Sequence, residues 1–274
     1  MITRYAAMFR RLERRGEGAF IPFAMLGDPD PDRSLAAIRT LAASGGDALE
    51  LGLPFSDPVA DGPVIQAAAA RALANGVRQA DCWRVVAELR SEFPDLPIGL
   101  LVYANLVCHR EPARFYAAAR EAGVDSVLVA DLPVLESAEV AAAARAQDIA
   151  PVFIAPPNAD DARLAAIAAA SEGYTYVTSR EGVTGADESL RRDQTALIAR
   201  LREHGAPPPV LGFGISTPAQ VRSALAMGAA GAISGSAVVK KMVGGEDVGE
   251  FVRVMKAATR GLQSGNRQPA AGNS

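Results

Sequence analysis

The chain has 274 residues, of which 49% are hydrophobic, 22% are charged and 5% are aromatic, and its formal net charge is −3. This composition can form a large core, but it lacks the basic surface that binding to a nucleic-acid backbone requires. No apolar run reaches the ~18 residues of a membrane-spanning helix. We therefore expect neither nucleic acid nor a membrane as a partner.

The first predicted element is a basic amphipathic helix within residues 1–18, MITRYAAMFRRLERRGEG. A transit peptide would be poor in acidic residues, whereas Glu13 and Glu17 interrupt this segment and no cleavage pattern follows. We predict a solvated surface helix. Cys82 and Cys108 have neither a metal-ligand spacing nor a disulfide pattern, which predicts a reducing, cytoplasmic location.

Eight short apolar runs then alternate with longer, Ala-rich stretches of helical period, and Gly or Pro marks most of the boundaries. The predicted strands lie within residues 19–26, 48–54, 97–107, 125–133, 150–157, 174–179, 209–215 and 230–236. The predicted helices lie within residues 31–45, 81–93, 111–123, 137–148, 160–173, 189–205, 217–228 and 248–261.

Eight strand–helix pairs in a chain of this length fit a closed barrel better than an open, doubly wound sheet. The predicted fold is α/β: a single (β/α)8 TIM barrel over residues 1–262, with the extra N-terminal helix and a short helix after strand eight. Residues 263–274 have no periodicity and are predicted to be a disordered tail. Chemistry in such barrels takes place at the carboxyl ends of the strands.

Glu50 is the most unusual residue of the predicted strands, because it stands between Leu49 and Leu51. Side chains alternate along a strand, so Glu50 and the two leucines face opposite sides of the sheet. In apolar surroundings the pKa of a glutamate rises, which makes it a proton donor near neutral pH. The alternative is a structural glutamate that pairs with an arginine.

Asp57 and Asp61 follow in the loop DPVADGP. Both could simply stabilise a turn, since Asp, Pro and Gly are common turn residues. A carboxylate in this loop could instead share a cavity with Glu50, and two carboxyl groups in different environments can act as a proton donor and a charged acceptor.

Glycines gather in the last three strand–helix loops, in GVTG at residues 182–185, GFGIS at 212–216 and GAISGS at 231–236. Glycine lets backbone N–H groups approach a phosphate, and the segment SAVVKKM is predicted to be the short helix whose N-terminus holds it. The alternative for each of these loops is ordinary turn chemistry.

Lysine and histidine are scarce. Lys240, Lys241 and Lys256 all lie outside the predicted strands, which argues against a Schiff base inside the barrel. His109 and His204 are far apart in the sequence, so neither a metal site nor a serine-type triad is expected. The remaining chemistry is proton transfer by carboxyl groups on a phosphorylated small molecule.

Seven motifs in chain order carry a resemblance to a known family: AFIPFAMLGDPD, LELGLPFSDPVADGPVIQ, PIGLLVYANLV, GVDSVLVADLP, SREGVTGA, GFGIST and GAISGSAVVK. Together they closely resemble the alpha subunit of tryptophan synthase over residues 5–260. The resemblance implies a lyase of tryptophan biosynthesis. Its reaction is the retro-aldol cleavage of indole-3-glycerol phosphate to indole and glyceraldehyde 3-phosphate, without a Schiff base or a metal.

The resemblance also implies roles for individual residues. Glu50 would protonate indole C3 and take the proton of the glycerol hydroxyl, and Asp61 would accept the indole N–H. Thr184 would be a residue of a lid that positions this carboxylate. The implied indole pocket comprises Phe23, Leu101, Leu128, Ala130, Tyr176, Phe213 and Ile233, and the implied phosphate site comprises Gly185, Gly214, Gly235 and Ser236.

The resemblance further implies a beta subunit that consumes the indole and carries pyridoxal phosphate, in an alpha2–beta2 heterotetramer, with no cofactor on this chain. The implied contact residues are Pro54, Asp57, Asn105, Pro133 and Asn158. Two other functions remain open. One is a different phosphate-binding barrel, such as a sugar-phosphate isomerase or indole-glycerol-phosphate synthase, and the other is a non-catalytic subunit that only activates a partner.

Overall fold

The computed structural model describes residues 3–109, 111–178 and 188–261, and within them nine parallel strands form one sheet in the order β5-β4-β3-β2-β1-β9-β8-β7-β6. The strands are β1 Ala19–Met25, β2 Leu49–Gly52, β3 Ile98–Val102, β4 Ser126–Val129, β5 Ala150–Val152, β6 Ile154–Ala155, β7 Thr175–Thr178, β8 Pro209–Gly212 and β9 Gly231–Ser234.

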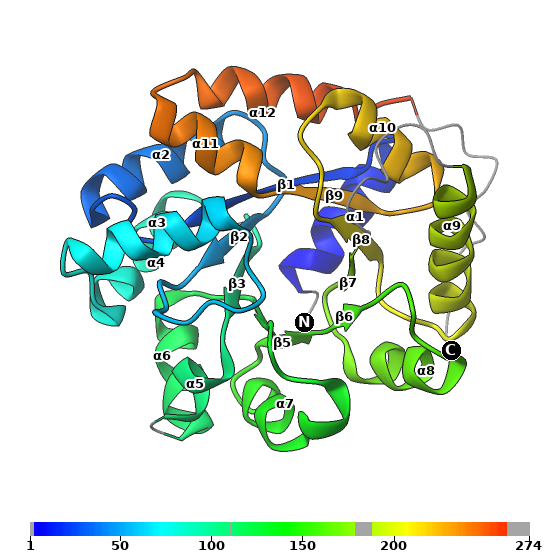
Figure 1. Ribbon diagram of the computed structural model, residues 1–274, viewed down its shortest axis with the longest axis horizontal. Helices are drawn as coiled ribbons and strands as arrows, with labels where there is room; N and C mark the ends of the chain where they lie inside the picture. The colour runs from blue at the N-terminus through cyan, green and yellow to red at the C-terminus, as the bar shows by residue number, and fades with distance from the viewer. Residues whose placement is uncertain (1–2, 110, 179–187, 262–274) are drawn as a thin grey trace.

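The two ends of this sheet meet in a single stretch of chain. β5 pairs with β4 and β6 pairs with β7, and only Phe153 separates β5 from β6. The nine segments therefore correspond to the eight predicted strands, with the fifth divided in two, and they enclose a barrel around which the helices form a ring (Figure 1). The predicted (β/α)8 TIM barrel is confirmed.

The predicted helices also form. They are α1 Arg4–Arg14, α2 Pro31–Ala43, α4 Gln79–Glu92, α6 Pro112–Ala122, α7 Ala138–Arg145, α8 Asp161–Ala170, α9 Glu188–Glu203, α10 Pro218–Ala226, α11 Ser236–Gly244 and α12 Val248–Ala257, of which α11 is the predicted short helix after the last strand. Residues 263–274, the predicted tail, lie outside the described residues. No helix in the described ranges is long and apolar enough to cross a membrane.

The structure adds three elements to those predicted and shortens one strand. α3 Pro63–Ala74 is not among the predicted helices, although Pro63 at the first helical position and the following alanines are helix signals. The strand predicted over residues 97–107 is wrong beyond Val102: pairing of β3 with β4 ends there, and the chain enters α5 Ala104–Cys108. The 3-10 helix η1 Val134–Glu136 is the third addition.

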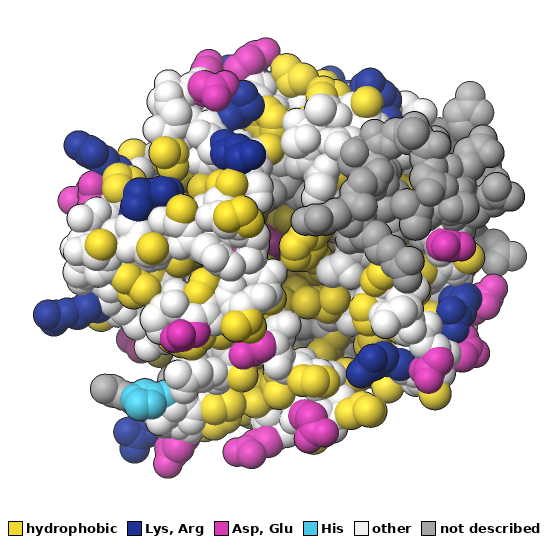
Figure 2. Space-filling view, viewed as in Figure 1, with side chains coloured by type: hydrophobic (Ala, Val, Ile, Leu, Met, Phe, Trp, Pro, Cys, Tyr) yellow, Lys and Arg dark blue, Asp and Glu magenta, His cyan; other side chains and the backbone are white. Residues whose placement is uncertain are grey.

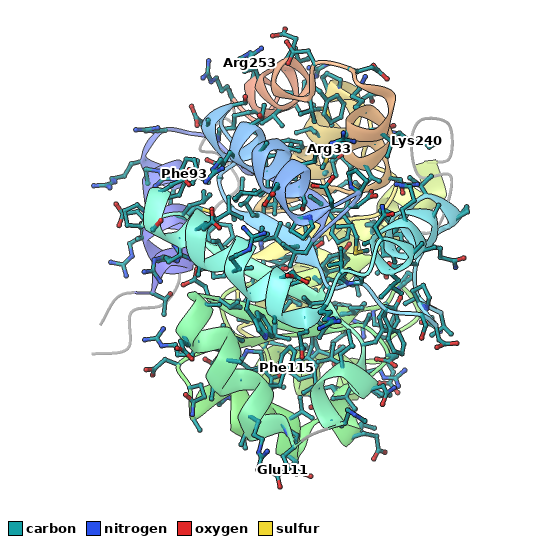
Figure 3. All side chains as sticks on the ribbon, turned by 90° about the vertical axis from the view of Figure 1, so that its left-hand side faces the viewer. Arg33, Phe93, Glu111, Phe115, Lys240 and Arg253 are labelled. Atoms are coloured by element: carbon teal, nitrogen blue, oxygen red, sulfur yellow. The ribbon has the colours of Figure 1, made fainter. Side chains whose placement is uncertain are left out.

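Hydrophobic side chains pack on both sides of the sheet. The outer layer lies between strands and helices and includes Phe20, Leu49 and Leu51. On the side of the barrel shown in Figure 3, α2, α4 and α6 lie next to one another, and Phe115 of α6 meets Trp83 of α4 with ring centroids 5.5 Å apart. This ring of helices keeps water from the outer face of the sheet.

The second cluster lies inside the barrel and includes residues of α1. Tyr5, Met8 and Leu12 are buried against inward-facing strand residues. Because the Tyr5 hydroxyl lies 2.9 Å from Oγ of Ser126, the first residue of β4, α1 closes the amino end of the barrel. The prediction of an amphipathic helix is confirmed, but its apolar face is part of the interior rather than solvated.

Buried ion pairs hold the amino end of the barrel together. Asp47 accepts a hydrogen bond from the Phe20 N–H at 2.9 Å and lies 2.8 Å from Lys256 Nζ, which also lies 3.0 Å from Glu17 Oε2. Burial raises the pKa of Asp47 despite the neighbouring Lys256 ammonium. The network joins α12 to β1 and to the segment before β2, and removing Asp47 would leave Lys256 with Glu17 as its only carboxylate partner in the network.

We predict that Asp47→Ala lowers the free energy of unfolding by ~2 kcal/mol, because Lys256 loses one of its two carboxylate partners and the buried Phe20 N–H loses its acceptor. Urea denaturation measures the change. The matched control is Arg33→Ala, which removes a side chain that is 79% exposed in its pair with Asp30 (Figure 3) and should cost at most ~0.5 kcal/mol. Equal losses in both variants would contradict the structural role of Asp47.

Candidate active site

Glu50 lies inside the barrel. Leu49 and Leu51 belong to the outer hydrophobic layer, so the predicted alternation along β2 directs Glu50 inward. Its side chain is 2% exposed, and its paired neighbours are Phe23 on β1 and Gly99 on β3.

A tyrosine, not an arginine, is the hydrogen-bond partner that the structure gives Glu50. The Tyr174 hydroxyl donates to Glu50 Oε1 at 2.9 Å, from residue 174 directly before β7. Burial raises the pKa of Glu50 to about 7 and the negative charge of Asp61 adds to this rise, while the hydrogen bond from Tyr174 opposes it. Glu50 is therefore a buried acid that exchanges its proton near neutral pH, as the sequence predicts.

Asp61 lies in the loop between β2 and α3. Its side chain is partly buried, and burial raises its pKa while a hydrogen bond from Tyr103 lowers it. Its charge acts on Glu50 and on Tyr176, so the structure brings the predicted pair of carboxyl groups into one electrostatic environment. Asp57, in contrast, is exposed, and it is not among the charged groups that act on Glu50.

The predicted indole-binding residues come from five strands and from the segments that follow β4 and β8. Phe23, Leu128, Tyr176 and Ile233 belong to the hydrophobic cluster inside the barrel, and the partly buried Leu101 and Ala130 pack against it. Phe213 follows β8, is 48% exposed, and meets the Tyr176 ring edge-on with centroids 6.3 Å apart. In the view of Figure 2, hydrophobic side chains lie within and around a hollow at the centre of this face.

The glycine loops also lie at the carboxyl ends of their strands. Phe213 and Gly214 have φ values of 67° and 73°, so the chain turns sharply after β8, where glycine is favoured. Gly235 precedes α11, and no side chain caps the N-terminus of this helix at Ser236. The uncapped N–H groups of its first turn are free to bind an anion.

Two predicted site residues, Thr184 and Gly185, lie outside the described residues. Of the predicted contact residues, Asp57, Asn105, Pro133 and Asn158 are exposed and Pro54 is partly buried. Their roles stay predictions.

Three aromatic residues of the site were missed by the sequence interpretation: Tyr174, Tyr103 and Phe55. Tyr174 precedes a strand by one residue and Tyr103 falls within a predicted one, so both resemble ordinary core aromatics in the sequence. Their hydroxyl contacts join segments that are 124 and 43 residues apart, and no local pattern reports such contacts.

The described residues contain no group of three His, Cys, Asp or Glu side chains placed to hold a metal ion. What the site does contain is a buried acid with a pKa of about 7, a second carboxyl group, apolar walls and a helix N-terminus that suits an anion. The fold and site thus define an α/β-barrel enzyme of the acid–base class whose substrate combines an apolar group with an anionic one.

Comparison with known proteins identifies the family within this class. The family model for the tryptophan synthase alpha chain matches residues 9–264. The tryptophan synthase alpha chain of Shewanella oneidensis is 56% identical over 265 residues, covering 94% of this chain and 95% of that protein. The corresponding chain of Pectobacterium atrosepticum is 55% identical over 267 residues, covering 94% of this chain and 100% of that protein.

Solved structures agree with these sequence matches. Mycobacterium tuberculosis tryptophan synthase superposes with a TM-score of 0.86 at 29% identity, covering 95% of this chain and 99% of that one. The alpha chain from Legionella pneumophila gives a TM-score of 0.85 at 27% identity, covering 94% and 98%. The chain belongs to the tryptophan synthase alpha chain family, and it is a lyase of tryptophan biosynthesis.

The raised pKa of Glu50 predicts a pH-dependent cost to stability. The pKa of Glu50 is 4.5 in the unfolded chain, the ordinary value for a glutamate, and about 7 in the folded chain. The protonated acid therefore stabilises the folded chain fully below pH 4.5. This stabilisation is lost as the pH rises through 7. We predict that wild-type protein loses ~3 kcal/mol more unfolding free energy than Glu50→Gln between the two limits. Urea denaturation from about pH 4.5 to pH 8 measures this difference. Parallel curves for the two proteins would contradict the buried, neutral acid.

Proposed function

We propose that Glu50 and Asp61 carry out the reaction of this family, the retro-aldol cleavage of indole-3-glycerol phosphate to indole and glyceraldehyde 3-phosphate. The single observation that supports it most is the inward-facing Glu50, 2% exposed and with a pKa raised to about 7. At neutral pH a substantial fraction of such an acid is protonated and can donate, and its carboxylate is readily reprotonated.

Neutral Glu50 donates its proton to indole C3, which gives an indolenine cation whose positive character extends to the ring nitrogen. The charged Asp61 accepts the N–H of this ring and stabilises the developing charge. The Glu50 carboxylate then takes the proton of the glycerol hydroxyl while the carbon–carbon bond breaks. The bonding electrons return to the ring, indole leaves with hydrogen at C3, and Glu50 regains its proton.

The apolar cluster and the glycine loops would orient the substrate between these groups. Phe23, Leu128, Tyr176 and Ile233 are buried side chains that fit a planar apolar ring. Gly214, Gly235 and Ser236, with Gly185 outside the described residues, would bind the phosphate through backbone N–H groups, helped by the positive end of the α11 dipole. Thr184 would position Asp61 from the loop after β7.

Members of this family work with a beta chain. We propose an alpha2–beta2 heterotetramer in which the indole passes to that chain, which is the one that holds pyridoxal phosphate. Pro54, Asp57, Asn105, Pro133 and Asn158 would face the partner. Two large apolar side chains near them support this surface: Val59 is 79% exposed and Leu135 is 72% exposed.

We further propose that residues 1–262 are one catalytic domain, followed by a tail at 263–274, and that the protein is cytoplasmic. Both cysteines are free thiols in the structure, Cys82 buried and Cys108 exposed, which fits a reducing compartment.

We predict that Glu50→Gln lowers kcat for indole release on the order of 10³-fold, because the amide cannot donate and take back the proton. The binding of a non-cleavable indole phosphate ligand should stay within about threefold of wild type, since the apolar and phosphate contacts remain. Glu121→Gln on the exposed side of α6 is the matched control and should keep wild-type turnover. Turnover by the Glu50 variant at the wild-type rate would rule out the proposed role.

The non-catalytic alternative is tested in the same assay with and without a tryptophan synthase beta chain. A lyase releases indole under both conditions. If the chain released no indole in either case but still raised the activity of the beta chain, the catalytic proposal would be replaced by a purely regulatory one.

We predict that Leu135→Asp weakens binding to the tryptophan synthase beta chain about tenfold or more, because a charge would have to be buried at the proposed contact. Isothermal titration calorimetry gives the Kd. Val254→Asp places the same charge at an apolar position of α12 that is 43% exposed, outside the proposed contact, and should leave the Kd unchanged. If the two variants bind equally well, Leu135 does not belong to the contact.

A further inference from the structure

Tyr103 has a buried position that the proposed reaction does not explain. It lies between β3 and α5, its side chain is 2% exposed, and it approaches the loop that carries Asp61. The loop begins after Gly52, at the end of β2, and ends at Gly62, before α3. It contains no strand or helix of its own that would fix its shape.

The ring of Tyr103 holds the beginning of this loop. It stacks on Phe55 with centroids 5.2 Å apart and an angle of 25° between the ring planes. Stacking of two aromatic rings adds to the burial of their faces and restricts both side chains.

The hydroxyl of Tyr103 holds the end of the loop. It accepts a hydrogen bond from the Ala60 N–H at 3.1 Å, in the residue directly before Asp61. A phenol has one proton to donate as well as lone pairs to accept with, and the hydroxyl is near enough to the Asp61 carboxylate to lower its pKa. One side chain therefore contacts the loop at Phe55 and at Ala60, the residue next to Asp61.

We propose that Tyr103 is a positioning residue for the cleavage reaction: its ring fixes the loop through Phe55, and its hydroxyl orients the Asp61 carboxylate toward the indole nitrogen. This inference rests on the proposed role of Asp61. Tyr103 acts through that carboxylate and not on the substrate.

The hydrogen bond also affects the charge of Asp61. Burial raises the pKa of this carboxyl group, and the Tyr103 hydroxyl lowers it by stabilising the charged form. The other titratable groups that face this pair are Glu50 of β2, Tyr176 of β7 and Asp131 after β4. Asp131 accepts a hydrogen bond from the Ala104 N–H at 2.7 Å, which fixes it beside Tyr103.

The test is Tyr103→Phe, which keeps the ring and removes only the hydroxyl. We expect kcat/KM for indole-3-glycerol phosphate to fall about tenfold. Since Asp61 must be charged and loses a bond that favours its charged form, the acidic limb of the kcat/KM profile should move to higher pH by about one unit. Tyr116→Phe removes the hydroxyl of another buried tyrosine, on α6, and is the matched control whose profile should not change.

Asp61→Asn and the double variant Tyr103→Phe/Asp61→Asn separate this inference from the role of Asp61. We expect Asp61→Asn to lose at least about 100-fold in kcat, and loss of the hydroxyl to add nothing to it, because Tyr103 acts through Asp61. Wild-type kcat in Asp61→Asn would overturn the role of Asp61 and this inference with it. An unshifted acidic limb in Tyr103→Phe, with Asp61→Asn inactive, would overturn only the inference.

Phe55→Leu keeps the hydroxyl and removes the ring stack, so it tests the other contact. We expect a similar fall in kcat/KM without the shift of the acidic limb, because the bond to Asp61 is retained while the loop is less restricted. Urea denaturation of each variant shows whether it is folded. Wild-type kcat/KM in a folded Phe55→Leu would overturn the part of the proposal that concerns the ring.

Discussion

Exclusion of water from Glu50 is the physical condition on which the site depends. A carboxyl group inside the barrel loses hydration, and this loss is the largest cause of its raised pKa. The amino end of the barrel contributes through α1, because the Tyr5 ring lies with its centroid 5.4 Å from that of Tyr174, whose hydroxyl binds Glu50. Gly99 leaves room for this arrangement, since a Cβ added there would lie 2.9 Å from the Tyr5 hydroxyl.

The two carboxyl groups differ because their elements differ. Glu50 is fixed on a strand, and its position follows from the pairing of β2 with β1 and β3. Asp61 lies in a loop and is only partly buried, so its position and charge depend on contacts that other segments supply, above all Tyr103. Because of this contrast, Glu50 can stay neutral and donate a proton while Asp61 stays charged and stabilises the positive charge that develops on the ring.

The stabilising ion pairs and the residues of the site lie at opposite ends of the barrel. Ion pairs such as Asp47–Lys256 and Arg90–Asp125, the latter 2.6 Å apart, lie toward the amino ends of the strands. The carboxyl ends hold the apolar pocket, the uncapped helix α11 and the exposed Val59 and Leu135. Exposed apolar side chains and uncapped N–H groups are tolerated at this end, because a substrate or a partner chain can cover or bind them.

The sequence by itself determined the eight strands, their order, the placement of Glu50 on the face opposite Leu49 and Leu51, and the family, because alternation, helical period and motif order are local properties of the chain. It could not determine that the fifth strand is divided at Phe153, that residues 104–108 form a helix, or that α1 closes the barrel. Only the tertiary structure decided which groups meet Glu50 and the loop of Asp61. Tyr174 and Tyr103 reach them across 124 and 43 residues, and such contacts depend on strand register and on the packing of the whole barrel.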